Sequence, residues 1–220
     1  MAHSVAPHFT QVAHQFDSAE QQRDAATLGM WIFLATEVMF FGGLFTTYSV
    51  YRALHPFAFA EVSRHLNITL GTINTAVLIG SSFTMALAVY GAQHGRRKML
   101  VLCLVSTMLL GSVFLGIKFY EYYQKFVEHF VPGSSFQFPA PYTKPAEMFF
   151  SLYFAMTGLH ALHMIVGLGL LATLTILAWR GKYSPSYYNP VELSGLYWHF
   201  VDIIWIFLYP LLYLIGRHLH

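Results

Sequence analysis

The stretch WIFLATEVMFFGGLF, residues 31–45, is apolar enough to form the middle of a membrane-spanning helix. Its one ionisable residue is Glu37. A charged side chain at the centre of a bilayer costs about 2.5 kcal/mol or more. The stretch therefore predicts a helical membrane protein, and it raises the question of what compensates for the buried acid.

The composition of the whole chain also indicates a membrane protein. Of its 220 residues, 56% are hydrophobic and 10% are charged, whereas a soluble domain carries about 25% charged residues. The mean hydropathy is +0.51. A net charge of +2 is too small to indicate a nucleic-acid partner. The single cysteine, Cys103, excludes a disulfide framework within the chain.

Five apolar runs have the length that a helix needs to cross a bilayer, about 20 residues. We expect an all-α bundle of five transmembrane helices, forming a single membrane domain over residues 25–216. The expected spans are about 27–51, 69–91, 99–120, 147–178 and 194–215. The third helix has a sequence that can extend past the hydrocarbon to Lys125. A loop with four prolines, VPGSSFQFPAPYTKP at 131–145, separates the third span from the fourth.

The polar N-terminal segment, residues 1–24, contains His3, His8 and His14. It has no basic region followed by an apolar one, so we expect no cleavable signal peptide and expect the first membrane helix to direct insertion. Asp24 stands just before the first apolar run as a candidate N-cap or first-turn acid.

Basic residues flanking the spans predict the orientation in the membrane. With the N-terminus inside, the two sides carry six basic residues each: Arg23, Arg96, Arg97, Lys98, Arg180 and Lys182 inside, and Arg52, Arg64, Lys118, Lys125, Lys144 and Arg217 outside. The basic cluster in the shortest loop breaks this tie. We therefore expect a cytoplasmic N-terminus and a periplasmic C-terminus.

Polar residues within the spans should face the protein interior, since lipid cannot form hydrogen bonds with them. Glu37 is either a protonated acid that donates one internal hydrogen bond or part of a proton-relay or substrate site. Asn74 and the Ser81–Ser82 pair are expected to link helices by hydrogen bonds. The loop residues Arg96, Arg97 and Lys98 are an orientation signal and also a candidate site for anionic lipid headgroups.

Two histidine motifs lie in the last two spans. TGLHALHMIVG places His160 and His163 three residues apart on one helix face, and YWHFVDIIW places His199 and Asp202 at the same spacing. The first pair could ligate a haem or another metal, respond to pH, or join helices within a polar network; the network is the preferred interpretation because no second matched pair for a haem exists. In the second pair a carboxylate can orient an imidazole.

With these motifs the chain resembles subunit III of the haem–copper respiratory oxidases. The signature of that family in its last helix is similar to YWHFVDxVW, and here Glu192 precedes Tyr197-Trp198-His199-Phe200-Val201-Asp202-Ile203-Ile204-Trp205. The stretch 158–167 resembles the family pattern GxHGLHVxxG. The first span, with Glu37 before Phe40-Phe41-Gly42, resembles the helix that holds the buried acid of the family. The resemblance covers residues from about 25 to 216.

The resemblance implies a function for the chain and a set of partners. Subunit III carries no haem or copper, packs against the catalytic subunit I, binds phospholipid, supports proton uptake and protects the active site during turnover. The resemblance implies subunit I as the main contact, with subunit II and small accessory subunits or a respiratory supercomplex as further partners. It places the haem and copper in the partner subunits. It also implies a location in the bacterial inner (plasma) membrane. Five spans are fewer than the seven of the mitochondrial form, whose lipid cleft is bounded by the two helices that are absent here.

The resemblance also suggests a role for the polar residues. We expect a buried polar network of Glu37, Asn74, His160, His163, Glu192, His199 and Asp202, no catalytic residue and no metal ligand. Glu37 would be mostly protonated and bound by His160, His163 or His199; the alternative is direct transfer of the pumped proton through Glu37.

Other functions remain to be separated from this one. Glu rather than Asp at position 37 favours a cytochrome c oxidase, and the alternatives are subunit III of a quinol oxidase or a homologue associated with nitric-oxide reduction. A transporter would need Gly or Pro interruptions in paired spans, and Pro210 has no counterpart. A stand-alone membrane cytochrome would bind haem itself.

Overall fold

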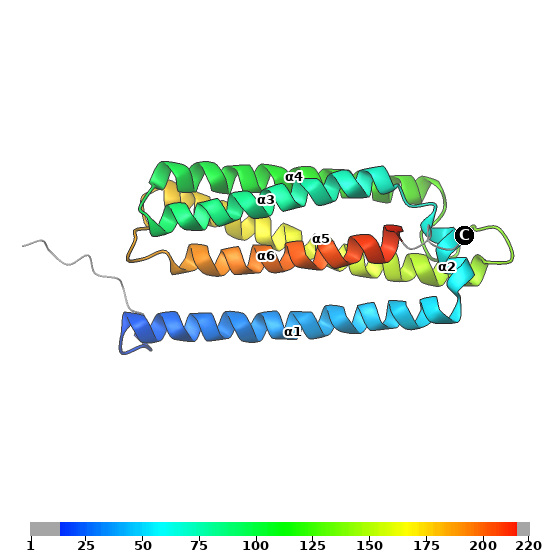
Figure 1. Ribbon diagram of the computed structural model, residues 1–220, viewed down its shortest axis with the longest axis horizontal. Coiled ribbons are helices and arrows are strands. Elements are labelled where there is room, and N and C mark those ends of the chain that lie inside the picture. The colour runs from blue at the N-terminus through cyan, green and yellow to red at the C-terminus, as the bar shows by residue number, and fades with distance from the viewer. Residues whose placement is uncertain (1–13, 215–220) are drawn as a thin grey trace, which may run out of the picture.

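The computed structural model describes residues 14–214, and its regular elements are helices (Figure 1). Five helices are long and apolar enough to cross a membrane, which confirms the all-α, five-span prediction. They are α1 (Ala19–Leu54), α3 (Ile68–Gln93), α4 (Arg97–Val127), α5 (Thr143–Trp179) and α6 (Asn189–Tyr209). A short α2 (Pro56–Ser63) and a final π-helical turn, η1 (Pro210–Leu214), complete the order. His3, His8 and Arg217 lie outside the described residues.

The helix ends follow local capping chemistry, which corrects one expectation. The N-cap of α1 is Ser18, whose Oγ accepts a hydrogen bond from the Gln21 backbone N–H at 3.1 Å. The prediction of Asp24 as N-cap was wrong, because the helix begins in the polar segment, before the apolar run. Asn67 caps α3 in the same way. Pro145 lies in the first turn of α5, where a missing N–H costs little.

Two connections show how short turns set the order of the helices. Gly95, with φ of 66°, makes the turn from α3 to α4, a backbone conformation that favours glycine. At the other end of the chain, Pro210 follows α6 and has no N–H to continue the α-helical pattern. The chain continues there as the π-helical turn η1.

Helices α3 to α6 pack as a group, and α1 lies along one side of them (Figure 1). Helix α1 contacts α5 and α6 and is joined to α3 through α2. Its buried residues Leu34, Phe41 and Tyr48 recur every seven positions and so share one face. Most of its other large side chains are exposed, as expected of a helix whose remaining surface meets lipid or another subunit.

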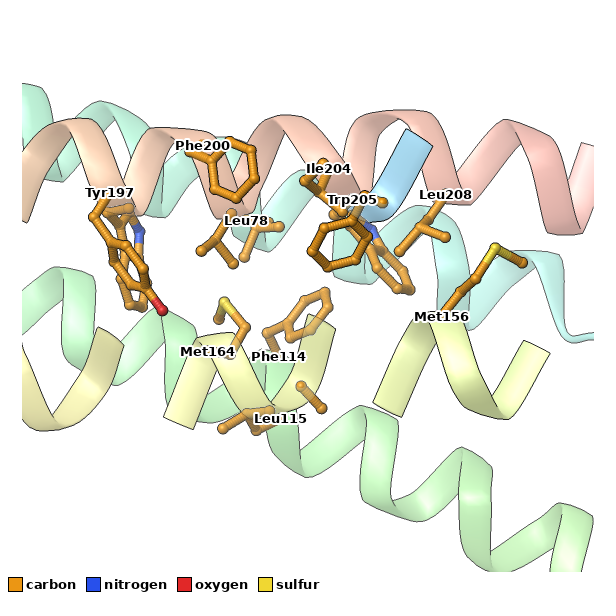
Figure 2. Packing of buried hydrophobic residues seen from close by; sticks show 14 of the residues in the cluster. Leu78, Phe114, Leu115, Met156, Met164, Tyr197, Phe200, Ile204, Trp205 and Leu208 are labelled. Atoms are coloured by element: carbon orange, nitrogen blue, oxygen red, sulfur yellow. The ribbon is translucent and has the colours of Figure 1, made fainter. Parts of the chain in front are cut away.

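The core of the group formed by α3, α4, α5 and α6 is built on aromatic and aliphatic side chains (Figure 2). The Trp205 ring meets Phe114 edge-on with centroids 4.8 Å apart. The fully buried Trp198 indole lies against α4 at Gly111 and against α5 at Gly167; a Cβ at either glycine would come within 2.8 Å and 3.0 Å of its ring atoms. The two glycines therefore allow three helices to meet around one indole.

Candidate functional site

Glu37 lies where α1 meets α5. Its Oε2 is 3.3 Å from His163 Nε2, and the two side chains are 20% and 14% exposed. Among the three histidines expected as partners, the structure brings His163 to the acid. The carboxyl group therefore lies at a seam between helices, not at the centre of the bundle.

The proton arrangement of this pair follows from the other ring nitrogen. His163 Nδ1 lies 2.9 Å from the backbone oxygen of Leu159. Since a carbonyl oxygen can only accept a hydrogen bond, Nδ1 carries a hydrogen. Nε2 then accepts from a protonated Glu37 or, in the imidazolium form, donates to its carboxylate. Either way a single proton links α1 to α5.

His163 also marks the junction of α5 with α6. The Tyr197 hydroxyl donates to the backbone oxygen of His163 at 3.0 Å, and its ring stacks near the imidazole. Phe41, from the buried face of α1, packs against the same imidazole with ring centroids 5.6 Å apart. The seam thus combines two polar contacts with aromatic packing from three helices.

His160 points into the core of the bundle and is only 1% exposed. Its ring lies 5.4 Å from Phe114 and 5.3 Å from Trp205, measured between centroids. Within residues 14–214 neither of its nitrogens has a hydrogen-bond partner. Asn74 is equally buried, and its amide donates to the Phe114 backbone oxygen at 3.4 Å. Both residues lie among the core rings, apart from the Glu37–His163 pair.

His199 and Asp202 face α3. The hydroxyl of Ser82 lies 2.7 Å from His199 Nδ1, so this contact joins α3 to α6. Ser82 also interacts with the Asp202 carboxyl group, but neither carboxyl oxygen has a well-formed hydrogen bond among the described residues. The expected pairing of the imidazole with its own carboxylate is replaced here by a shared neighbour on α3.

The remaining predicted residues lie at the end of the bundle that holds the short α3–α4 loop. Glu192 occupies the first turn of α6, where an acid is favourable for the helix dipole. Arg97 donates from Nε to the Ala178 backbone oxygen at 3.1 Å, so it caps the last turn of α5. Arg96 lies over the Tyr90 ring, and Lys98 is exposed.

A fully buried ion pair was not anticipated from the sequence. Lys118 Nζ donates to Glu121 Oε2 at 2.8 Å, to Tyr213 OH at 3.0 Å and to Tyr153 OH at 3.1 Å. The Tyr213 hydroxyl donates to Glu121 Oε1 at 2.6 Å. We call these four residues the lysine cluster. It joins α4 and α5 to the turn after α6, and every charge in it has a partner.

Lys118 and Lys125, which the orientation count places on the outer side, are buried within the bundle. The two residues are 1% and 3% exposed, and Lys125 donates to the His65 backbone oxygen at 2.8 Å. The spacing of Lys118 and Glu121, three residues apart on one helix face, was the available signal. The helix runs on to Val127, so that both residues lie within it.

Chemically, these side chains form hydrogen bonds and ion pairs between helices. A histidine–glutamate pair, a serine–histidine contact and the lysine cluster each connect different helices. In the described part of the chain, no three or more His, Cys, Asp or Glu side chains gather in a way that could hold a metal ion.

Comparison with known proteins places this architecture among oxidase subunits. The family model for cytochrome c oxidase subunit III matches residues 10–217. The cytochrome c oxidase subunit 3 of Thermostichus vulcanus is 32% identical over 210 residues, covering 91% of this chain and 92% of that protein. The probable cytochrome c oxidase subunit 3 of Nocardia farcinica is 34% identical over 189 residues, covering 86% and 87%. The cytochrome bo(3) ubiquinol oxidase subunit 3 of Pseudomonas aeruginosa is 28% identical over 207 residues, covering 94% and 92%.

Proposed function

The chain belongs to the cytochrome c oxidase subunit III family, and on that premise we propose that it is the non-catalytic subunit III of a proton-pumping terminal oxidase of the cytochrome c type. The family match over residues 10–217 carries this proposal. The resemblance expected from the sequence motifs is thereby confirmed. As a member of the family the chain is an integral membrane protein and part of an oxidoreductase complex.

The proposed role is to stabilise subunit I, bind phospholipid and support proton uptake while dioxygen is reduced to water. The haem and copper centres would then belong to partner subunits, with subunit I as the main contact and subunit II as a second one. The polar contacts described above support this role, since each of them joins helices to one another. Side chains used in this way give the complex a rigid, non-redox neighbour.

The choice of the cytochrome c type rests on Glu37 and on the relatives whose names specify cytochrome c oxidase. The relative from Pseudomonas aeruginosa is named for ubiquinol, so a quinol oxidase is the second candidate. Purification of the complex through an affinity tag on this chain separates the two. A co-purifying subunit II with a dinuclear-copper Cys/His motif is the expected result, and its absence beside an intact subunit I would assign the chain to a quinol oxidase.

The membrane orientation is proposed with the N-terminus in the cytoplasm of a bacterial cell. Without the buried Lys118 and Lys125, the count of basic residues becomes six on the inner side and four on the outer side, which favours this orientation. Arg96 and Lys98 remain exposed at the start of α4 as candidate contacts for anionic headgroups. Cysteine labelling from each side of intact spheroplasts, using Lys98→Cys in a Cys103→Ser background, tests the orientation. We expect Lys98→Cys to be protected from an impermeant reagent outside.

Replacement of Glu37 by Gln tests whether the acid is structural or carries the pumped proton. Gln retains the size and hydrogen-bonding capacity of Glu but cannot ionise. We expect normal assembly, normal initial turnover and proton pumping equal to wild type, measured with the oxidase reconstituted in vesicles. Loss of pumping with intact assembly and initial turnover would show that Glu37 transfers the pumped proton. The isolated chain should show no Soret absorption, and stoichiometric haem in it would overturn the proposal.

A further inference from the structure

A cavity of about 390 Å³ opens between α3 and α6 on the surface of the bundle. Its polar lining consists of Thr75, Ser82, His199 and Asp202, and its other walls are apolar. The rim residues Ile79, Phe83, Ile203 and Ile206 are about half exposed, at 54%, 64%, 50% and 46%. The volume is within the range of small-molecule sites, about 300–1,000 Å³. We call this cavity the α3–α6 groove.

A buried carboxyl group with spare acceptor capacity lines the groove. Asp202 is 3% exposed and lines the groove, and within residues 14–214 neither of its oxygens has a well-formed hydrogen bond. Its neighbour Ser82 interacts with this carboxyl group and also lies 2.7 Å from His199 Nδ1. The other fully buried acid, Glu121, has two close donors. A buried carboxyl group that is incompletely hydrogen-bonded is costly, so a ligand that supplies a hydroxyl or N–H gains affinity there.

The depth of Asp202 limits the kind of ligand. It lies 13 residues after Asn189 and 12 before Leu214, the ends of the span. At 1.5 Å per residue these are about 20 Å and about 18 Å, so the carboxyl group lies near the middle of a hydrocarbon core that is about 30 Å thick. A phospholipid headgroup is held at the membrane surface, and an acyl chain has no donor. The donor must therefore be carried by a molecule that dissolves in the hydrocarbon.

We propose that the α3–α6 groove binds the ring of a membrane-soluble quinol, with a ring hydroxyl donating to the Asp202 carboxyl group. A quinol ring is flat, uncharged and apolar between its two hydroxyl groups, which matches apolar walls that carry a few polar side chains. The proposal concerns binding alone, and it holds for an oxidase of either donor type.

Photolabelling of the purified oxidase complex tests this proposal. The complex is reconstituted in phosphatidylcholine nanodiscs and irradiated with an azido-ubiquinol analogue, and labelled peptides are mapped by mass spectrometry. We expect labels within residues 75–86 and 199–206. Unlabelled short-chain ubiquinol should compete for the site, whereas its dimethyl ether, which has no hydroxyl donor, should compete about tenfold less well.

Variants of the groove distinguish binding at this site from general partition into the membrane. Asp202→Leu removes the acceptor and should lower labelling about tenfold, and Asp202→Asn, which keeps one acceptor oxygen, should restore part of it. Ala86→Phe fills the groove without touching the carboxyl group. Its matched control is Ala155→Phe, an exposed alanine in the middle of α5, which should label like wild type.

Three results would overturn the proposal. One is labelling that Ala86→Phe and Ala155→Phe change equally. Another is equal competition by the quinol and its dimethyl ether, which would indicate an apolar slot for any chain. The third is crosslinking of a photoactivatable residue at position 79 to a partner subunit, which would show that protein covers the groove. If Asp202→Leu fails to assemble, the two alanine variants still decide the matter.

Discussion

Glu121 and Glu37 both lie within spans of this protein, and their surroundings differ. Glu121 is 1% exposed and receives hydrogen bonds from Lys118 at 2.8 Å and Tyr213 at 2.6 Å. Glu37 has a side chain that is 20% exposed, with His163 at 3.3 Å as its contact. The first acid lies in a cluster that α4, α5 and the end of α6 complete together. The second lies at the seam where α1 rests on the bundle.

The contrast shows that an acid in a membrane helix can be accommodated in different ways. In the lysine cluster the protein supplies the opposite charge and the donors itself, so the buried charges are compensated internally. At the seam the compensation is one long contact whose proton either partner can hold. Helix α1 is therefore held mainly by apolar packing through Leu34, Phe41 and Tyr48. Helices α4 and α5 and the turn after α6 are also joined by the lysine cluster.

The largest effect should come from removing the cation of the lysine cluster. Lys118→Met leaves Glu121 buried without its charge partner, which costs about 3–5 kcal/mol of stability. Heat denaturation of the detergent-solubilised complex and the yield of assembled chain measure this loss. The double variant Lys118→Met/Glu121→Leu should recover much of it. Lys144→Met, at an exposed lysine, is the control, and equal stability of Lys118→Met and Lys144→Met would contradict the assignment.

A smaller loss should follow from Tyr213→Phe. The substitution keeps the ring but removes the hydroxyl that donates to Glu121 and accepts from Lys118. Hydrogen bonds to charged groups contribute about 1.5–3 kcal/mol, and the same heat denaturation should show a loss of that size. Tyr153→Phe removes one contact with Lys118, at 3.1 Å, and should cost less. The reverse order would mean that Tyr153 is the main neutral member of the cluster.

At the seam, Glu37→Gln should cost no more than about 1 kcal/mol, because one hydrogen bond to His163 is exchanged for another. Gln still forms a hydrogen bond with His163, and the apolar face of α1 is unchanged. Thermal stability of the complex measures this, with exposed Glu20→Gln as the control. A loss as large as that of Lys118→Met would remove the difference between the two regions and make the Glu37–His163 contact a main tie of the fold.

The spans could be predicted from the sequence because long apolar runs leave few other structures open to a chain. Helix α2 was not anticipated, since eight residues with no membrane-crossing length give only a weak signal. A histidine partner for the buried acid Glu37 could be predicted, because an acid within a membrane span must be compensated. The choice of His163 over His160 and His199 depends on how α1 packs. The lysine cluster was missed because its residues come from segments up to 95 positions apart. The groove beside Asp202 likewise arises from the packing of α3 against α6.

The smallest effect should come from Tyr48→Phe, the counterpart of Tyr213→Phe in the α1 region. The Tyr48 ring is fully buried and packs edge-on against Phe59 and Phe149, with centroids 5.4 Å and 6.0 Å away. Its hydroxyl has no hydrogen-bond partner in the part of the chain that the structure describes. Removing a buried, unsatisfied hydroxyl leaves the packing intact and relieves a desolvation cost, so stability should be unchanged or rise by up to about 1 kcal/mol. Removing the hydroxyl should therefore lower stability at Tyr213 but not at Tyr48, although both rings are buried. The difference between the two variants measures the hydrogen bonds to charged groups separately from the packing of the rings. A loss for Tyr48→Phe equal to that for Tyr213→Phe would mean that α1 is held by a polar tie after all.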